Sequence, residues 1–232
     1  MTITEQNFFN VLSDALWNRP LNLENPIEYD EILKLSASHQ LLALVFEKLC
    51  DSIEFKASSS YKKAYMEVMM TVISQTQRTE IFLDIYKKLL GLGIQPIVMK
   101  GIICRELYGK YKDHRPSSDE DLLVLPKDFS MICQFFISEG YKSNMNPDDI
   151  DLNELQAISF WKENGGHFEI HINPIGKSNE LSCLMDSYFH DVFKDSIVEE
   201  INGVKIKSMS HTNHFLFLVF HALGILSAAA SV

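Results

Sequence analysis

The feature that most constrains the fold is a change of hydrophobic period near residue 93. Before it, apolar residues recur at helical spacing, most clearly from Ser59 to Leu90, where Gly91 and Gly93 end the stretch. After it, short β-rich runs such as IQPIVM (94–99) alternate with amphipathic stretches. We therefore predict an α+β protein, in which a helical N-terminal region is followed by a small mixed β-sheet core with flanking helices.

Two pairs of strand-like runs enclose turn sequences of the hairpin type. The pairs are 157–161 with 167–172, around Asn164-Gly165-Gly166, and 192–201 with 204–206, around Asn202-Gly203. Asparagine and glycine accept the positive φ angles that tight hairpin turns require. We therefore predict two hairpins in the sheet. The methionine-rich part of the long helix, Met66 to Met70, is predicted to lie in the core.

The domain organisation expected from these patterns has three regions. They are a helical region at 1–92, an α/β core at 93–209, and the start of a further helical region at 210–232. The last region holds an apolar run, 214–232, which is long enough on length alone to span a membrane. It lacks a basic flank, and its two histidines, His214 and His221, fall on one helical face. We therefore expect a core helix that continues in a longer protein, with a membrane anchor as the alternative.

Composition and charge exclude several classes of function. Hydrophobic residues make up 46% of the chain and charged residues 22%, as in ordinary globular proteins. The formal net charge is -10 and basic residues are not clustered, which argues against binding to duplex nucleic acid. The cysteines form no CxxC pair, and MTITEQNFF at the N-terminus has no signal-peptide pattern. We expect a cytoplasmic protein with neither a structural zinc site nor disulfides. The four cysteines are Cys50, Cys104, Cys133 and Cys183.

Two aspartates stand two residues apart at the start of the strand-like run DEDLLVL, 119–125. On a strand, Asp119 and Asp121 would point to one face with Cα atoms roughly 6.6 Å apart, and Glu120 would point to the other. Carboxylates at that separation can share metal ions that lie roughly 3.5–4 Å from each other. The alternative is that these acids form only a solvated loop before a strand.

A second cluster follows in HFEIH, where His167, Glu169 and His171 alternate with apolar residues. The alternation puts these three side chains on one face of a strand and Phe168 and Ile170 on the core face. An exposed face explains this pattern without any function. Two histidines and one carboxylate could also bind iron or zinc.

Lys100 and Gly101 stand at a strand-to-helix junction. A helix N-terminus offers free backbone amides to a phosphate, and glycine permits close approach of the backbone. Lys100 adds a positive charge. The alternative is a simple turn, because a lysine-glycine pair alone is not a phosphate-binding loop.

The composite motif resembles an uncharacterised bacterial nucleotidyltransferase family of the polymerase-beta-like superfamily. Its parts are PIVMKGIICRELYG, RPSSDEDLLV and HFEIHINP, at 96–109, 115–124 and 167–174. The resemblance covers residues 25–225 if the helical flanks are included. In two places this sequence differs from the superfamily pattern: Ile102 follows Gly101 where glycine or serine is usual, and Glu120 stands where an apolar residue is usual.

The resemblance implies a polymerase-beta-like fold and a two-metal site for nucleotidyl transfer. By its pattern, Asp119, Asp121 and Glu169 would be the catalytic carboxylates and would bind Mg²⁺ or Mn²⁺. Other positions would serve the substrate: Lys100 and Gly101 would hold phosphate, Arg115 would meet a phosphate or the leaving pyrophosphate, and His167 and His171 would position Glu169 or touch substrate.

The function expected on this basis is transfer of a nucleoside monophosphate from a nucleoside triphosphate to a hydroxyl-bearing acceptor. Two alternatives stay open at this point. One is a mononuclear metal enzyme built on His167, Glu169 and His171. The other is a catalytically inactive member of the same fold that binds a nucleotide or a protein partner.

Overall fold

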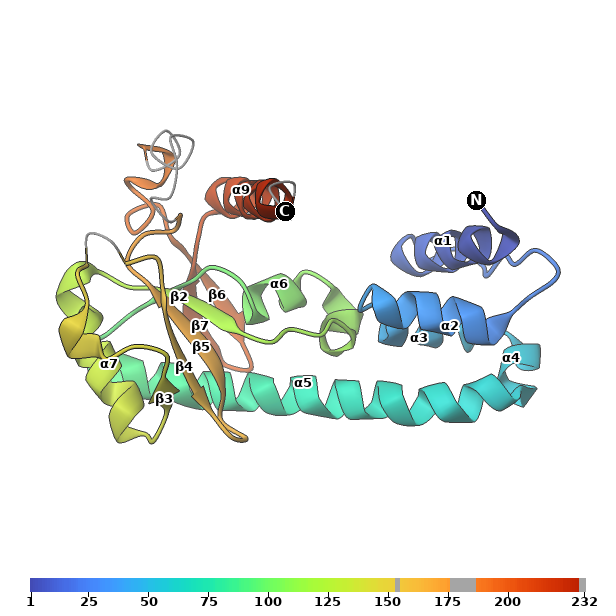
Figure 1. Ribbon diagram of the computed structural model, residues 1–232, viewed down its shortest axis with the longest axis horizontal. Coiled ribbons are helices and arrows are strands. Elements are labelled where there is room, and N and C mark those ends of the chain that lie inside the picture. Colours follow the sequence, from blue (N-terminus) through green and yellow to red (C-terminus); the bar gives the residue numbers. More distant parts are fainter. Residues whose placement is uncertain (153–154, 176–186, 230–232) are drawn as a thin grey trace. The chain divides into compact units, whose positions relative to one another are not determined.

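The structure is a computed structural model that describes residues 1–152, 155–175 and 187–229 (Figure 1). Cys183 and the last three residues of the predicted C-terminal region lie outside these ranges. The chain forms two compact units, one made of Met1–Gln77 with Arg105–Ser117, and the other of Arg78–Cys104 with the described residues from Ser118 onward. These bounds are not those of the three predicted regions, which stay a proposal.

The first unit is helical and has its own apolar core. Its elements are α1 (Ile3–Leu16), α2 (Tyr29–Ser38), α3 (Leu42–Leu49), α4 (Ile53–Ala57), the first part of α5 (Ser59–Gly91), and the 3₁₀ helix η1 (Gly109–His114). Helix α1 begins with a capping box in which Thr2 and Glu5 each bond the other's backbone amide. The side chain of Asn7, buried in α1, bonds both the amide and the carbonyl of Glu24 and so holds the segment before α2.

The long helix α5 is confirmed in length, but the prediction for its methionines is wrong. Met66 and Met70 are each 64% exposed, while Ala64 and Val68 carry the buried face. Small side chains let α5 approach the aromatic core of the first unit, where Phe46 and Phe55 lie. The larger methionines are therefore left on the outer side of the helix.

The second unit is built on a mixed seven-stranded sheet of order β3-β4-β5-β2-β1-β7-β6, which confirms the α+β prediction. The strands are β1 (Ile97–Val98), β2 (Glu120–Leu123), β3 (Lys142–Ser143), β4 (Ile158–Lys162), β5 (Gly166–His171), β6 (Ile197–Ile201) and β7 (Val204–Ser208). Strand β2 lies between β1, to which it is antiparallel, and β5, to which it is parallel. The other elements of this unit are η2 (Pro126–Asp128), α7 (Phe129–Ser138), η3 (Pro147–Asp149), η4 (Ser187–Phe189) and α9 (His211–Ala229). Helix α6 (Ile102–Glu106) begins in this unit and ends in the first.

Both predicted hairpins are confirmed. Strands β4 and β5 are antiparallel neighbours, and Asn164 and Gly166 in their turn have φ angles of 57° and 82°. Asn202 and Gly203, between β6 and β7, have φ angles of 47° and 77°, as the tight turn requires. Strand β6 begins at Ile197, later than the predicted residue 192.

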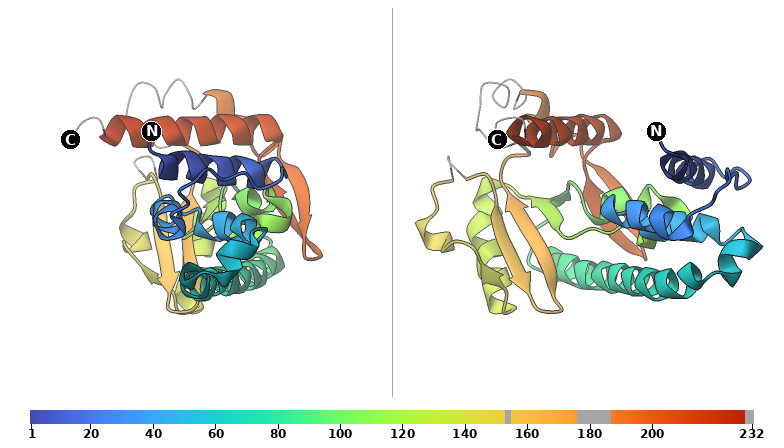
Figure 2. Two further views of the ribbon diagram at one scale, coloured as in Figure 1. Left: turned by 90° about the vertical axis from the view of Figure 1, so that its right-hand side faces the viewer. Right: turned by 45° about the vertical axis from the view of Figure 1, so that its right-hand side comes forward.

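The two faces of the sheet are covered by different helices (Figures 1 and 2). The end of α5 and helix α7 pack on one face, where Leu122, Phe168 and Ile170 belong to the larger core. Helix α9 packs on the other face, through Phe217 against a second cluster that includes Leu123. Ser210 caps α9 through its side chain, as predicted. Within the described residues, no helix has the length and apolar character that crossing a membrane requires.

Candidate active site

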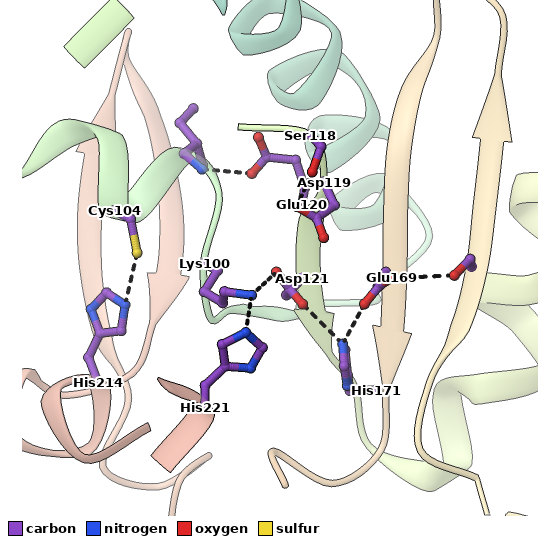
Figure 3. Close-up of polar contacts among 12 residues, drawn as sticks. Lys100, Cys104, Ser118, Asp119, Glu120, Asp121, Glu169, His171, His214 and His221 are labelled. Atoms are coloured by element: carbon purple, nitrogen blue, oxygen red, sulfur yellow. Dashed lines mark hydrogen bonds and ion pairs between the residues drawn. The ribbon is translucent and has the colours of Figure 1, made fainter. Parts of the chain in front are cut away.

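The pairing of β2 with β5 brings the two predicted acidic clusters together. Asp121 and Glu169 are direct partners in the parallel ladder, and both side chains project to the face that α9 covers (Figure 3). Because side chains alternate along a strand, Leu122 and Phe168 point to the opposite face and are buried there. The packing of that apolar face therefore sets the position of the acids.

Three of these side chains form a cluster that could hold a metal ion. One possible ligand atom from each of Asp121, Glu169 and His171 lies within 4.8 Å of the others. His171 Nε2 is 3.2 Å from Asp121 Oδ1 and 3.7 Å from Glu169 Oε2. Ser159 Oγ donates a hydrogen bond to Glu169 Oε1 at 3.5 Å, which orients the second carboxylate.

The two carboxylates of this cluster suit a hard divalent cation. Asp121 is only 3% exposed, and its Oδ2 atom is buried without a hydrogen-bond partner among the described residues. Lys100 Nζ lies 3.6 Å from this Oδ2 atom, an ion-pair distance. Two carboxylates, one with an oxygen free of hydrogen bonds, match the oxygen-rich ligation that Mg²⁺ and Mn²⁺ prefer.

The charges in the cluster depend on one another. Burial opposes ionisation of Asp121, but the hydrogen bond with His171 and the Lys100 charge outweigh it and lower the pKa of this carboxyl. The neighbouring His171, 3.7 Å away, likewise lowers the pKa of Glu169. Burial opposes the protonation of His171, but its interactions with the two carboxylates outweigh burial and raise its pKa. The two carboxylates thus favour the protonated form of His171, and a divalent cation bound to them would compete with that proton.

Asp119 and His167 are not members of this cluster, although both lie near it in sequence. Asp119 precedes β2, is half-buried, and accepts a hydrogen bond from Ser118 Oγ at 3.0 Å. His167 is half-buried on β5, on the same face as Glu169. The metal-binding and accessory roles of these two residues stay predictions.

Glu120 is a neighbour of the cluster whose hydrogen bond the sequence did not predict. It points to the opposite face from Asp121, as predicted, and there its Oε2 atom accepts the backbone N–H of Ile102 at 2.7 Å. Gly101 has a φ of +66°, and a Cβ at this position would collide with the Glu120 carboxylate and come within 2.9 Å of the Asp119 carbonyl. One amide at the start of α6 is therefore already bonded by protein. A phosphate contact from Gly101 stays a prediction.

Arg115 belongs to the first unit, whereas the carboxylates belong to the second. Its guanidinium lies 6.0 Å from the centre of the Tyr108 ring, at the end of η1. The structure leaves its predicted contact with phosphate as a proposal.

His221 is a second neighbour that sequence reasoning did not place in the site. Its Nε2 atom lies 3.2 Å from Lys100 Nζ, and Figure 3 shows Lys100 between Asp121 and His221. His214, seven residues earlier, lies 3.6 Å from Cys104 Sγ. The spacing of the two histidines on one helical face was the only sequence signal for this arrangement.

The fold and the cluster together define a mixed-sheet α+β protein with a candidate metal centre at the β2–β5 pair. The chain belongs to a family described as uncharacterised nucleotidyltransferases, whose family model matches residues 25–225. No curated protein and no solved structure matches the chain.

Proposed function

We propose that this chain is a cytoplasmic enzyme that moves a nucleoside monophosphate from a nucleoside triphosphate to a hydroxyl group of an acceptor. The observation that carries the proposal is the cluster of Asp121, Glu169 and His171 with Lys100 beside it. Membership of a nucleotidyltransferase family supports this reaction class. A cytoplasmic location is supported by free thiols at Cys50 and Cys133, since a reducing compartment preserves them.

The proposed cofactor is Mg²⁺ or Mn²⁺, held by Asp121 and Glu169, with Asp119 completing the set of carboxylates. When bound, the cation would lower the pKa of the acceptor hydroxyl and stabilise charge on the α-phosphate. In the reaction, a bond forms between the acceptor oxygen and the α-phosphorus, and the bond from that phosphorus to the bridging oxygen breaks. Pyrophosphate is the leaving group, and the hydroxyl proton passes to solvent.

The side chains around the cluster have distinct parts in this proposal. His171 lies between Asp121 and Glu169 and keeps both carboxylates oriented toward the same bound cation. Lys100, at 3.6 Å from Asp121 Oδ2, is near enough to donate to a phosphate oxygen of a triphosphate bound there. Arg115 is proposed to meet the triphosphate or the leaving pyrophosphate, and His167 is proposed as an accessory residue.

The net charge of -10 argues that the nucleotide partner is small. A duplex would be repelled over a long surface, whereas a triphosphate needs only local neutralisation by Lys100 and the bound cation. The proposed partners are therefore a nucleoside triphosphate and a hydroxyl-bearing acceptor, without duplex nucleic acid or membrane.

The test is calorimetric titration of ATP into the protein with and without Mg²⁺. We expect binding that requires the metal and that the Asp121→Asn variant loses. Release of pyrophosphate from labelled triphosphates, on addition of cell extract as a source of acceptor, would then establish transfer. Tight uptake of zinc or iron without nucleotide, lost in the His167→Ala variant, would support the mononuclear alternative instead. Absence of any transfer despite metal-dependent binding would favour an inactive member of the fold.

A further inference from the structure

Helix α9 reaches the candidate site through two histidines that contact one segment of the chain. His214 lies against Cys104 in the buried part of the helix, and His221 lies against Lys100. The histidines are seven residues apart, about two helical turns, and so share a face. That face follows the segment which leads from β1 into α6. The two histidines therefore contact Cys104 and Lys100 at successive points along this segment (Figure 3).

The Lys100 ammonium is contacted from two sides. Asp121 Oδ2 lies 3.6 Å away on one side, and His221 Nε2 lies 3.2 Å away on the other. An ammonium group only donates hydrogen bonds, so the Nε2 atom of His221 must accept and its Nδ1 atom must carry the proton. This agrees with a neutral imidazole: partial burial, and then the Lys100 charge, lower the pKa of His221.

The two contacts of Lys100 would not respond alike to a bound metal. Asp121 is a proposed metal ligand, and its lone pairs would turn to the cation, which also repels the lysine charge. His221 is not in the metal cluster found among the described residues, so its lone pair stays available to Lys100. Without that partner, the long lysine side chain would regain its rotamer freedom and spend less time near a phosphate.

We propose that His221 is a positioning residue for Lys100, and that α9 in this way forms part of the nucleotide site. The inference rests on the proposed function, because the benefit of a positioned Lys100 is contact with a triphosphate. The contact itself concerns only residues of this chain and can be measured without nucleotide.

The first experiment measures triphosphate binding and transfer in His221 variants. His221→Ala should raise the KM for the triphosphate about fivefold, as expected for the loss of one solvent-exposed hydrogen bond of ordinary strength, with kcat changed less than about twofold. His221→Gln should restore most of the affinity, because its amide oxygen can accept from the ammonium. His211→Ala is the matched control, since His211 is an exposed histidine in the first turn of the same helix.

A double-mutant cycle distinguishes positioning from a structural effect. If His221 acts through Lys100, His221→Ala should have no further effect on the KM in a Lys100→Met background. Additive losses in the double variant would contradict the proposal and indicate that α9 is merely displaced. Thermal unfolding of each variant shows whether the fold is retained, and His221→Gln keeps the test decisive if the alanine variant does not fold.

The second experiment reads the tautomer of His221 from its ring ¹⁵N shifts in the protein without nucleotide. We expect the Nδ1–H tautomer in the natural sequence, and a shift toward Nε2–H in Lys100→Met. An Nε2–H ring in the natural sequence would overturn the inference whatever the activity. If the tautomer is as expected but His221→Ala binds triphosphate normally, the positioning role is wrong and the proposed function stands. If neither the natural protein nor any variant binds a triphosphate, the positioning role and the proposed function are both wrong.

Discussion

On one face of β2 and β5, Leu122, Phe168 and Ile170 are almost fully buried, whereas the opposite face carries Asp121 and Glu169. The first face packs against α5 and α7. The stability of this packing depends on the volumes of the apolar side chains and does not change with pH or metal binding. The second face is held by electrostatic interactions, since His171 Nε2 lies 3.2 Å from Asp121 and 3.7 Å from Glu169. Since alternate residues of the same strands form the two faces, the apolar face supplies the rigidity that the charged face needs to bind a cation.

The largest expected effect comes from the apolar face. Phe168→Ala should lower the free energy of unfolding by about 3–5 kcal/mol, because it removes a buried aromatic ring. The Phe168 side chain is 1% exposed, and its ring centroid lies 5.0 Å from that of Phe136. Urea denaturation followed by circular dichroism measures this. His167→Ala, next to it on the charged face, should cost less than about 1 kcal/mol. Equal losses in both variants would mean that the faces do not differ as described.

On the charged face, Asp121→Asn should lower the rate of nucleotidyl transfer about 10²- to 10³-fold, the range for loss of a group that stabilises transition-state charge. The fold should persist, since the substitution keeps the volume and removes a negative charge opposite Glu169. Steady-state kinetics and a denaturation curve on the same sample separate the two effects. A similar loss in Asp119→Asn would support the paired aspartates, and an unchanged rate in Asp121→Asn would exclude the metal assignment.

A smaller effect is expected at Gly101, which lies against the Glu120 carboxylate. Gly101→Ala should destabilise the protein by about 1–3 kcal/mol, because the residue has a positive φ and its Cβ would collide with the Glu120 carboxylate. Gly203→Ala is the matched control, with a φ of +77° but open space around its Cβ. The difference between the two unfolding free energies isolates the collision from the backbone strain. No difference would show that Glu120 moves away without cost.

The smallest effect is the pH dependence of the metal-free protein. The raised pKa of His171 contributes stability that is present below its unfolded value of about 6.5 and is lost as pH rises through the folded value. The lowered pKa values of Asp121 and Glu169 contribute stability that is present above about pH 4 and is lost as pH falls. The cluster should therefore stabilise most between about pH 4.5 and 6.5.

Urea unfolding in the presence of a chelator, at pH 5.5 and 8.5, tests this dependence. The natural protein should lose more stability at the higher pH than His171→Asn does. Parallel changes in both proteins would mean that the charged face contributes no pH dependence of its own.

The local features of the fold could be predicted from particular residues. Asn202-Gly203 defined a hairpin, because few other residue pairs accept two positive φ angles, and HFEIH placed Phe168 and Glu169 on opposite faces. The exposure of Met66 and Met70 could not be predicted, since a long helix with several apolar residues has more than one possible buried face. The role of Glu120 was also hidden, because its partner is a backbone amide and carries no sequence signal.

The sequence by itself determined where the long helix and the two hairpins lie, and that Phe168 and Glu169 fall on opposite faces of a strand, because these depend on backbone geometry over a few residues. Only the tertiary structure decided that β2 pairs with β5, which sets Asp121 opposite Glu169 and beside a histidine 50 residues away. It also decided that Lys100 meets His221, 121 residues further along the chain. Such pairings form because the apolar faces of distant segments are buried together. The spacing of residues along the chain does not predict which distant segments will pack against each other.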